Sequence, residues 1–291
     1  MSDLIPIIDT HQHLIYPDQW PYSWTDGVPA LAGQAFRFDD YLNAIKGTGI
    51  ARTVFMETSP DDPHWKHEAK FVYGLASQPG SLISGAIANC RPEHDGFADY
   101  IESIRAPRLV GLRRILHVQP DELSQSPLFA QNLALLETVN LSFDLCVRAR
   151  QIPLAIALVK TLPRVQFILD HCGNPDIAAD NGNGPATQWR EAIQSIARLP
   201  NIACKISGIV ANCNPGTVSV DLLRPYVEHC IESFGWDRVI WGSDWPVCLT
   251  TSDLPTWAGI TRKIASAEDP ENQRRLFCEN ACRIYRVSKA I

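Results

Sequence analysis

The feature that most constrains the fold is a regular alternation of short apolar runs with longer amphipathic segments along the whole chain. The runs predict eight strands, at residues 4–9, 52–57, 82–88, 109–115, 141–147, 165–170, 202–206 and 238–243. The segments between and after them predict helices at 38–48, 64–76, 95–105, 128–140, 152–162, 187–199, 220–234 and 269–285. Continuous apolar strands separated by helices indicate a parallel sheet covered on both faces.

Eight strand–helix units in 291 residues favour a closed (β/α)8 TIM barrel over an open doubly wound sheet. No Gly-x-Gly-x-x-Gly follows the first strand, which argues against a dinucleotide-binding fold. No second domain is visible. We therefore expect residues 1–291 to form a single barrel domain.

The net charge limits the classes of binding partner, and the cysteine pattern indicates the cellular compartment. The net charge is −6 and no Lys/Arg run stands out, which argues against nucleic acid and anionic membranes. No apolar run approaches the roughly 20 residues that span a bilayer. The nine cysteines are scattered without a Cys-x-x-Cys, and the N-terminus has no signal-peptide pattern, so we expect reduced thiols in a cytoplasmic protein. The sequence leaves the oligomeric state open.

The ends of the predicted strands carry the residues of chemical interest, because a TIM barrel builds its active site there. Asp244 follows the eighth strand and precedes Pro246, and a buried acid is costly unless something uses it. His11 and His13 are two apart, so they project to the same face and could ligate a metal or bind one oxygen atom. Other strand ends supply further candidates, namely Glu57, Arg114, His117, Arg148 (or Asp144 if it points inward), His171 and Lys205.

Each candidate also has a structural interpretation. Asp244 could cap the next segment, and Lys205 could form a salt bridge with a buried acid such as Glu57 or Asp244. A lone His-x-His is structural more often than not. Their shared location at three strand ends of one barrel favours the functional interpretation for His11, His13, His171 and Asp244.

Several stretches together resemble one family, the amidohydrolase superfamily, and within it the sugar-lactonase branch of L-fuconolactonase and L-rhamnonolactonase-like enzymes. The resemblance runs from about residue 7 to residue 287. It rests on His11-Gln12-His13, Gly111–Leu116, Ser142–Arg148, Leu169-Asp170-His171, Cys204-Lys205-Ile206-Ser207-Gly208 and Trp241-Gly242-Ser243-Asp244-Trp245-Pro246. It implies a TIM barrel that hydrolyses a small-molecule sugar lactone.

The chain departs from the binuclear members of that superfamily at two strands. Those members resemble it at the first and last strands but also use a carboxylated Lys on the fourth strand and a His on the fifth. Here these strands end in Arg113-Arg114 and Val147-Arg148, and an arginine cannot ligate a metal at neutral pH. This argues against a two-metal site. One divalent ion, zinc before others, is chemically reasonable on His11, His13 and Asp244, with His171 as a further candidate. The resemblance includes members that work without metal, so the ion could be dispensable, and no organic cofactor is implied.

Lactone hydrolysis needs a deprotonated water, a polarised carbonyl and a proton for the leaving alkoxide. We assign Asp244 as the general base, which then returns the proton to the ring oxygen. His171, together with His11 and His13 or the ion they hold, polarises the carbonyl. Lys205 is a third catalytic candidate, through contact with the substrate.

The expected substrate is a neutral aldonolactone such as L-fucono- or L-rhamnonolactone. Aromatic faces near the barrel mouth suit a sugar ring, and few arginine forks are present for a dicarboxylate. The predicted substrate-binding residues are Trp24, Glu57, Arg114, His117, Arg148 and Trp245. Three alternatives stay open: hydrolysis of a pyrone dicarboxylate lactone, metal-dependent decarboxylation, and sugar binding without catalysis.

Overall fold

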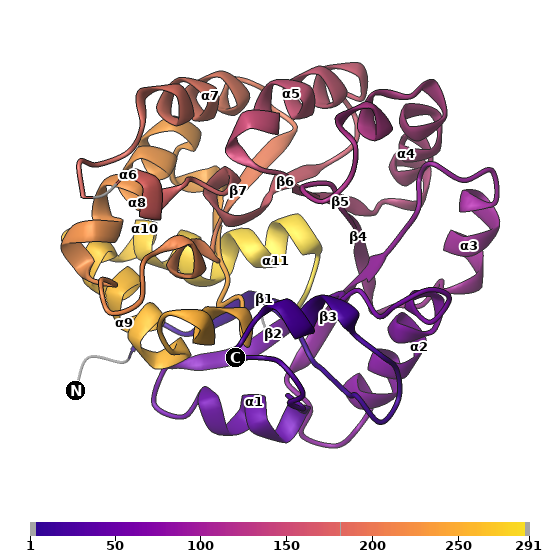
Figure 1. Ribbon diagram of the computed structural model, residues 1–291, viewed down its shortest axis with the longest axis horizontal. Helices are drawn as coiled ribbons and strands as arrows, with labels where there is room; N and C mark the ends of the chain where they lie inside the picture. Colours follow the sequence, from indigo (N-terminus) through magenta and orange to yellow (C-terminus); the bar gives the residue numbers. More distant parts are fainter. Residues whose placement is uncertain (1–3, 181, 289–291) are drawn as a thin grey trace.

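Eight parallel strands form one sheet in sequential order, which confirms the predicted TIM barrel (Figure 1). The computed structural model describes residues 4–180 and 182–288. The strands are β1 (Ile7–Gln12), β2 (Ile50–Met56), β3 (Ile83–Asn89), β4 (Leu109–Ile115), β5 (Ser142–Cys146), β6 (Phe167–Leu169), β7 (Ile202–Ile206) and β8 (Val239–Trp241).

The segment after β8 joins the end of β1 and so brings the two ends of the sheet together. The Asp244 amide donates to the His11 carbonyl at 2.7 Å, and the His13 amide donates to the Trp245 carbonyl at 2.7 Å. The Thr10 hydroxyl donates to the Trp241 carbonyl at 2.6 Å. These bonds hold the first and last predicted strand ends next to each other.

Helices surround the sheet (Figure 1). They are α1 (Phe38–Ala44), α2 (Trp65–Ala76), α3 (Phe97–Ser103), α4 (Pro127–Val139), α5 (Ile152–Thr161), α6 (Ile177–Asp180), α7 (Thr187–Ala197), α8 (Val220–Phe234), α9 (Leu254–Ala265), α10 (Pro270–Arg274) and α11 (Asn280–Tyr285). Among residues 4–180 and 182–288, no helix is both long and apolar enough to cross a membrane.

Three helical regions differ from the prediction. Helix α6 lies between two predicted helices, in a segment expected to be a loop. Helix α9 was not predicted, although Asp253 caps it by accepting a bond from the Thr256 amide and a proline stands in its first turn. The single helix expected at 269–285 is α10 and α11 joined by a π-helical turn at Arg275–Glu279.

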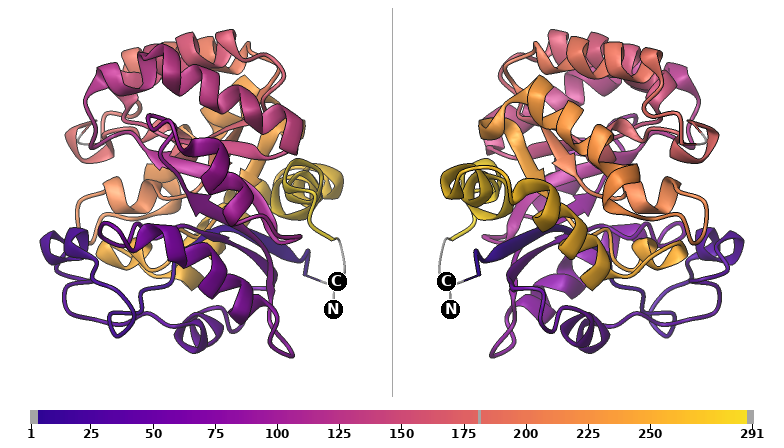
Figure 2. Two further views of the ribbon diagram at one scale, coloured as in Figure 1. Left: turned by 90° about the vertical axis from the view of Figure 1, so that its right-hand side faces the viewer. Right: turned by 90° about the vertical axis from the view of Figure 1, so that its left-hand side faces the viewer.

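The C-terminal helix closes one end of the barrel. Inward-facing residues of the strands pack against α11 and its surroundings, and this cluster includes Ile8, Val54, Ile87, Ile168, Ala203, Ile240, Ala281, Ile284 and Tyr285. Figure 2 shows α11 in yellow at one end of the barrel. The opposite end, where the strands finish, is therefore the end that can hold a site.

A buried polar layer lies directly above this apolar layer. Two residues beyond Ile87, Ile168 and Ala203 come Asn89, Asp170 and Lys205, which are at most 3% exposed. Because side chains two apart on a strand share a face, each of these polar groups points into the barrel above an apolar neighbour.

Candidate active site

Three predicted residues meet at the open end of the barrel. Oδ1 of Asp244 lies 3.6 Å from Nε2 of His11 and 3.3 Å from Nε2 of His13. The two imidazole rings have centroids 4.9 Å apart. All three residues are at most 5% exposed. We call His11, His13 and Asp244 the triad.

The second nitrogen of His13 determines what the triad can hold. Nδ1 of His13 lies 3.1 Å from the Met56 carbonyl oxygen and 3.0 Å from that of Glu57. Since carbonyl oxygens only accept, Nδ1 carries a proton, and in the neutral form of the ring Nε2 bears the lone pair that faces the Asp244 carboxylate. Two facing acceptors at this distance are suited to a cation or a water molecule between them.

The donor set also fits one divalent ion. Ligand atoms of His11, His13 and Asp244 all lie within 4.8 Å of one another, and all three residues are buried. Two imidazoles and a carboxylate are the ligand types found in catalytic zinc sites with an open position. Ligand atoms of another group, made of His11, Asp170 and His171, also lie within 4.8 Å of one another.

His171 stands beside the triad on a left-handed turn after β6. Its φ is 55° within the short helical turn Asp170–Gly173, and its ring centroid lies 4.4 Å from that of His11. Nδ1 of His171 lies 2.9 Å from the Ser207 hydroxyl. Burial lowers the pKa of His171, although Asp244 and Asp170 oppose the shift. His171 is thus neutral near pH 7, and if the Ser207 hydroxyl donates to Nδ1, Nε2–H is free to donate.

The His171 ring occupies the space that a side chain at position 208 would need, and Gly208 has none. Its φ is +64°, and a Cβ at this position would lie 2.2 Å from Nδ1 of His171. We expect Gly208→Ala to lower the free energy of unfolding by about 1–3 kcal/mol more than Gly216→Ala, measured by urea unfolding. Gly216 is the matched control, because it shares the left-handed φ (+77°) but a Cβ there meets nothing within 4 Å. Equal losses would show that the His171 ring moves aside freely.

Lys205 lies beneath His11 rather than at the surface of the site. Its Nζ is 2.5 Å from Oδ1 of Asp144, 3.0 Å from Oδ1 of Asp170 and 3.3 Å from Nδ1 of His11. The Tyr285 hydroxyl donates to Asp144 at 2.7 Å. Asp144 therefore does point inward, and the partners expected for Lys205, Glu57 or Asp244, were wrong because the acids of β5 and β6 flank it. No part of the Lys205 side chain is exposed.

Arg113, not the predicted Arg114, reaches the centre from β4. Its Nε donates to Glu57 Oε1 at 2.7 Å, its Nη2 donates to the Glu57 carbonyl at 2.8 Å, and its Nη1 lies 3.2 Å from Nε2 of His11. Arg114, on the other face of the strand, pairs with Glu93 at 2.6 Å. Binding of the substrate by Arg114 stays a prediction, and its guanidinium group already has the Glu93 carboxylate as a partner.

Glu57 has a different role from the one predicted. Its side chain is unexposed and binds Arg113, and it also accepts a bond from the Asn89 amide at 2.7 Å. A carboxylate enclosed by these partners anchors Arg113 and offers the substrate no free face.

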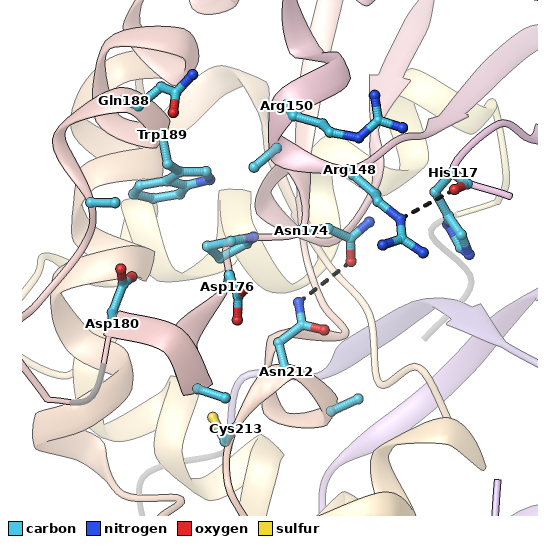
Figure 3. A pocket seen from close by; sticks show the side chains of 15 residues that line it. His117, Arg148, Arg150, Asn174, Asp176, Asp180, Gln188, Trp189, Asn212 and Cys213 are labelled. Carbon is cyan, nitrogen blue, oxygen red and sulfur yellow. Dashed lines mark hydrogen bonds between the residues drawn. The ribbon is translucent and has the colours of Figure 1, made fainter. Parts of the chain in front are cut away.

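A cavity of about 790 Å³ opens between the loops that follow β4, β5, β6 and β7, and no residue of the triad lines it (Figure 3). The predicted residues His117 and Arg148 both line it, and Nε of Arg148 donates to the His117 carbonyl at 3.2 Å. Burial lowers the pKa of His117 to about 4, so its ring is neutral. The prediction did not include the other polar lining residues, among them Asn174, Asp176, Gln188 and Asn212. The short segment from His171 to Asn174 links this cavity to the triad.

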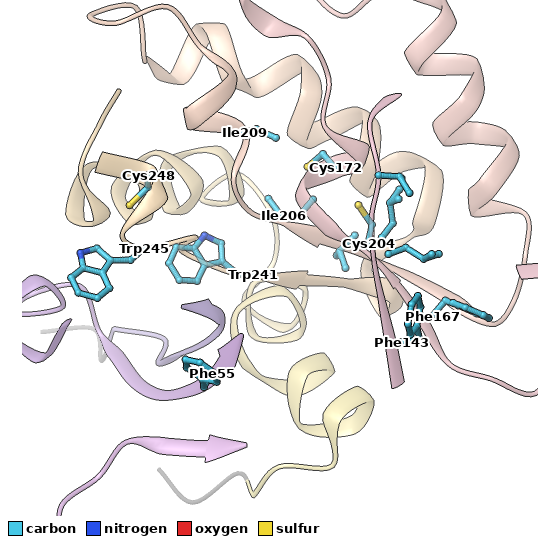
Figure 4. Close-up of a cluster of buried hydrophobic side chains, with 14 of the residues drawn as sticks. Phe55, Phe143, Phe167, Cys172, Cys204, Ile206, Ile209, Trp241, Trp245 and Cys248 are labelled. Carbon is cyan, nitrogen blue, oxygen red and sulfur yellow. The ribbon is translucent and has the colours of Figure 1, made fainter. Parts of the chain in front are cut away.

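The two predicted tryptophans differ in exposure. Trp24 is 37% exposed, and its Nε1 donates to the Thr58 carbonyl at 2.9 Å. Trp245 is only 2% exposed, and its ring packs against Phe36 and Tyr41 with centroids 5.6 and 5.5 Å apart. Figure 4 shows Trp245 near Cys248 within a buried cluster. Trp245 therefore has no ring face available to a sugar, contrary to the prediction.

Comparisons with known proteins agree with this architecture. The amidohydrolase family model matches residues 8–287. An L-fucono-1,5-lactonase from Burkholderia ambifaria is 28% identical, over 97% of this chain and 96% of its own, and an L-fucono-1,5-lactonase from Burkholderia multivorans is 27% identical over 96% and 95%. A solved amidohydrolase from Burkholderia multivorans with bound zinc has a TM-score of 0.87 at 22% identity, covering 97% of this chain and all of its own. With nearly its full length matched, the chain belongs to the amidohydrolase family.

Proposed function

We propose that the protein hydrolyses a sugar-acid lactone to the open acid. It is a hydrolase of the lactone-cleaving kind, as are the curated relatives that match almost its full length. The observation that carries the proposal is the Asp244 carboxylate facing two imidazoles, with His171 alongside and a cavity at the same end of the barrel. The preferred substrates are aldonolactones such as L-fucono- or L-rhamnonolactone.

Asp244 is the general base in this proposal. Its carboxylate takes a proton from water as the water oxygen attacks the lactone carbonyl, and later returns that proton to the ring oxygen as the C–O bond breaks. Nε2–H of His171 donates to the developing oxyanion, which requires the Ser207 hydroxyl to donate to Nδ1. Lys205 makes no substrate contact here, because it is enclosed beneath His11 by two carboxylates.

A divalent ion, zinc before others, would be held by His11, His13 and Asp244. When bound, such an ion supplies Lewis acidity to a carbonyl and lowers the pKa of a bound water. The residue roles above do not require it, since an ester carbonyl needs less activation than an amide.

The cavity supports a neutral, hydroxyl-rich substrate over a dicarboxylate. Two arginines line the cavity. Arg150 is paired with Asp121 at 2.6 Å, so Arg148 is the one whose guanidinium group is not paired with a carboxylate. The Asp176 carboxylate and the Asn212 amide line the same space. Mixed donors and acceptors match sugar hydroxyls, whereas two substrate carboxylates would need more forks. We assign His117 and Arg148 to the polyol part of the substrate. Trp24 does not line this cavity, so its contact with the substrate stays a prediction.

A substrate screen tests the proposed function. Purified protein is offered aldonolactones, a pyrone dicarboxylate lactone and a hydroxybenzoate, with and without chelator, and acid release is followed with a pH indicator. We expect acid release from aldonolactones, strongest for six-carbon deoxysugar lactones. Faster turnover of the pyrone dicarboxylate, or carbon dioxide release from the hydroxybenzoate that stops with chelator, would overturn the proposal in favour of the corresponding alternative.

A further inference from the structure

The contact between Arg113 and His11 has a consequence for metal binding. Nη1 of Arg113 lies 3.2 Å from Nε2 of His11, the same nitrogen that faces Asp244 at 3.6 Å. A guanidinium only donates, so a hydrogen bond here requires Nε2 to be the acceptor, while the Lys205 ammonium, also a donor only, lies 3.3 Å from Nδ1 on the other side of the ring. Nδ1 therefore has a cation and an acceptor beside it, since Oδ1 of Asp170 lies 3.5 Å away.

A metal ion needs the same lone pair. An imidazole nitrogen has one lone pair in the ring plane, and it cannot serve a guanidinium N–H and a metal ion together. A divalent ion on the triad would also stand close to a full positive charge. The Arg113–His11 contact and an ion coordinated by Nε2 of His11 therefore exclude each other.

The protein holds Arg113 firmly in this competing position. The Glu57 carboxylate accepts one bond from the guanidinium group at 2.7 Å, and the Glu57 backbone carbonyl accepts another at 2.8 Å. A carboxylate oxygen of Asp170 lies 3.7 Å from Nη1. The Arg113 side chain is 4% exposed and that of Glu57 is unexposed. Swinging Arg113 away would leave the Glu57 carboxylate buried without its cation, which is unfavourable.

We propose that Arg113 is a built-in competitor of the metal ion, which keeps the affinity of the triad for divalent cations low and the ion exchangeable. A ligand set that would otherwise be a tight zinc site is thereby held available for water. This inference does not depend on the identity of the substrate, because its consequence is a metal affinity.

Metal affinity of matched variants tests the proposal. Zinc dissociation constants are measured by competition with a chromophoric chelator, and cobalt(II) spectra report coordination. We expect Arg113→Met/Glu57→Gln, which removes the cation together with its counter-charge, to bind zinc about 10–100-fold more tightly than the unaltered protein. Adding His11→Ala to this variant should abolish the gain. Equal zinc affinity with and without Arg113 would overturn the proposal.

A measurement on the unaltered protein guards against a variant that does not fold. Nitrogen-15 NMR of the histidine rings distinguishes the two neutral tautomers, and His11→Ala identifies the His11 signals. We expect the Nε2 signal of His11 to stay unchanged when one equivalent of zinc is added, because Arg113 occupies that side of the ring. A metal-induced shift of Nε2 at that ratio would contradict the competition. Neither readout uses lactone, so a failed substrate screen leaves this test intact.

Discussion

Replacing Asp244 by asparagine is expected to lower kcat/KM for the best lactone by about 10²–10⁴-fold, the usual contribution of general base catalysis. Asparagine keeps the shape of the side chain and a carbonyl oxygen but cannot take a proton from water. His11 or His13 would have to move before it could act as the base in place of Asp244, since their Nε2 atoms are 3.6 and 3.3 Å from its Oδ1. The measurement is steady-state hydrolysis, with Asp99→Asn on the exposed face of α3 as control.

A comparison with and without chelator separates the two tasks that Asp244 could perform. If Asp244 is the base, the loss has the same size in metal-free and zinc-loaded protein. A loss confined to zinc-loaded protein would make Asp244 a ligand only. Activity within about tenfold of the unaltered enzyme under both conditions would rule out the base assignment.

The fold and part of the site could be predicted because they depend on local patterns. The short apolar runs have the length of barrel strands, and the longer amphipathic segments between them have the pattern of helices. His11, His13 and Asp244 were found because a position at a strand end suffices to place them near the mouth. Closure of the sheet, through bonds such as Asp244 N–H to the His11 carbonyl, then brings them within contact distance.

Residues whose role depends on the direction of one side chain could not be predicted as well. Arg113 and Arg114 are neighbours of identical chemistry, and only the register of β4 in the barrel decides which one points inward. Trp245 is similar, because its neighbour Asp244 takes the inward direction and leaves Trp245 to pack on Phe36 and Tyr41.

The buried ion pairs are a different limitation. The sequence predicted an acidic partner for Lys205 but not which one. The acids within reach are Asp144 of β5 and Asp170 after β6, and only the packing of the strands in the barrel selects them. A usable signal was present in the sequence: Asp170 and Lys205 each follow an inward apolar residue by two positions, which predicts a polar layer above an apolar one.

That layer leads to the second large effect, a loss of stability in Lys205→Met. The Lys205 ammonium lies between the carboxylates of Asp144 and Asp170, and none of the three side chains is exposed. Burial lowers the pKa of Lys205, but the two carboxylates outweigh it and raise this pKa above its usual value. Removing the cation leaves two buried carboxylates without it, so we expect a loss of about 3–5 kcal/mol in the free energy of unfolding, measured by urea denaturation.

Two further variants show whether charge is the cause of that loss. Lys205→Met/Asp144→Asn removes one uncompensated carboxylate and should recover a large part of the stability, because a neutral amide can still bond to the Tyr285 hydroxyl that now donates to Asp144 at 2.7 Å. Lys160→Met, at an exposed position near the end of α5, should change stability by no more than about 0.5 kcal/mol. If the double variant is as unstable as Lys205→Met alone, the loss comes from packing around the lysine stem and the charge explanation is wrong. If Lys205→Met is itself as stable as the unaltered protein, Asp144 and Asp170 must take up protons on folding, and the layer beneath His11 does not need its cation.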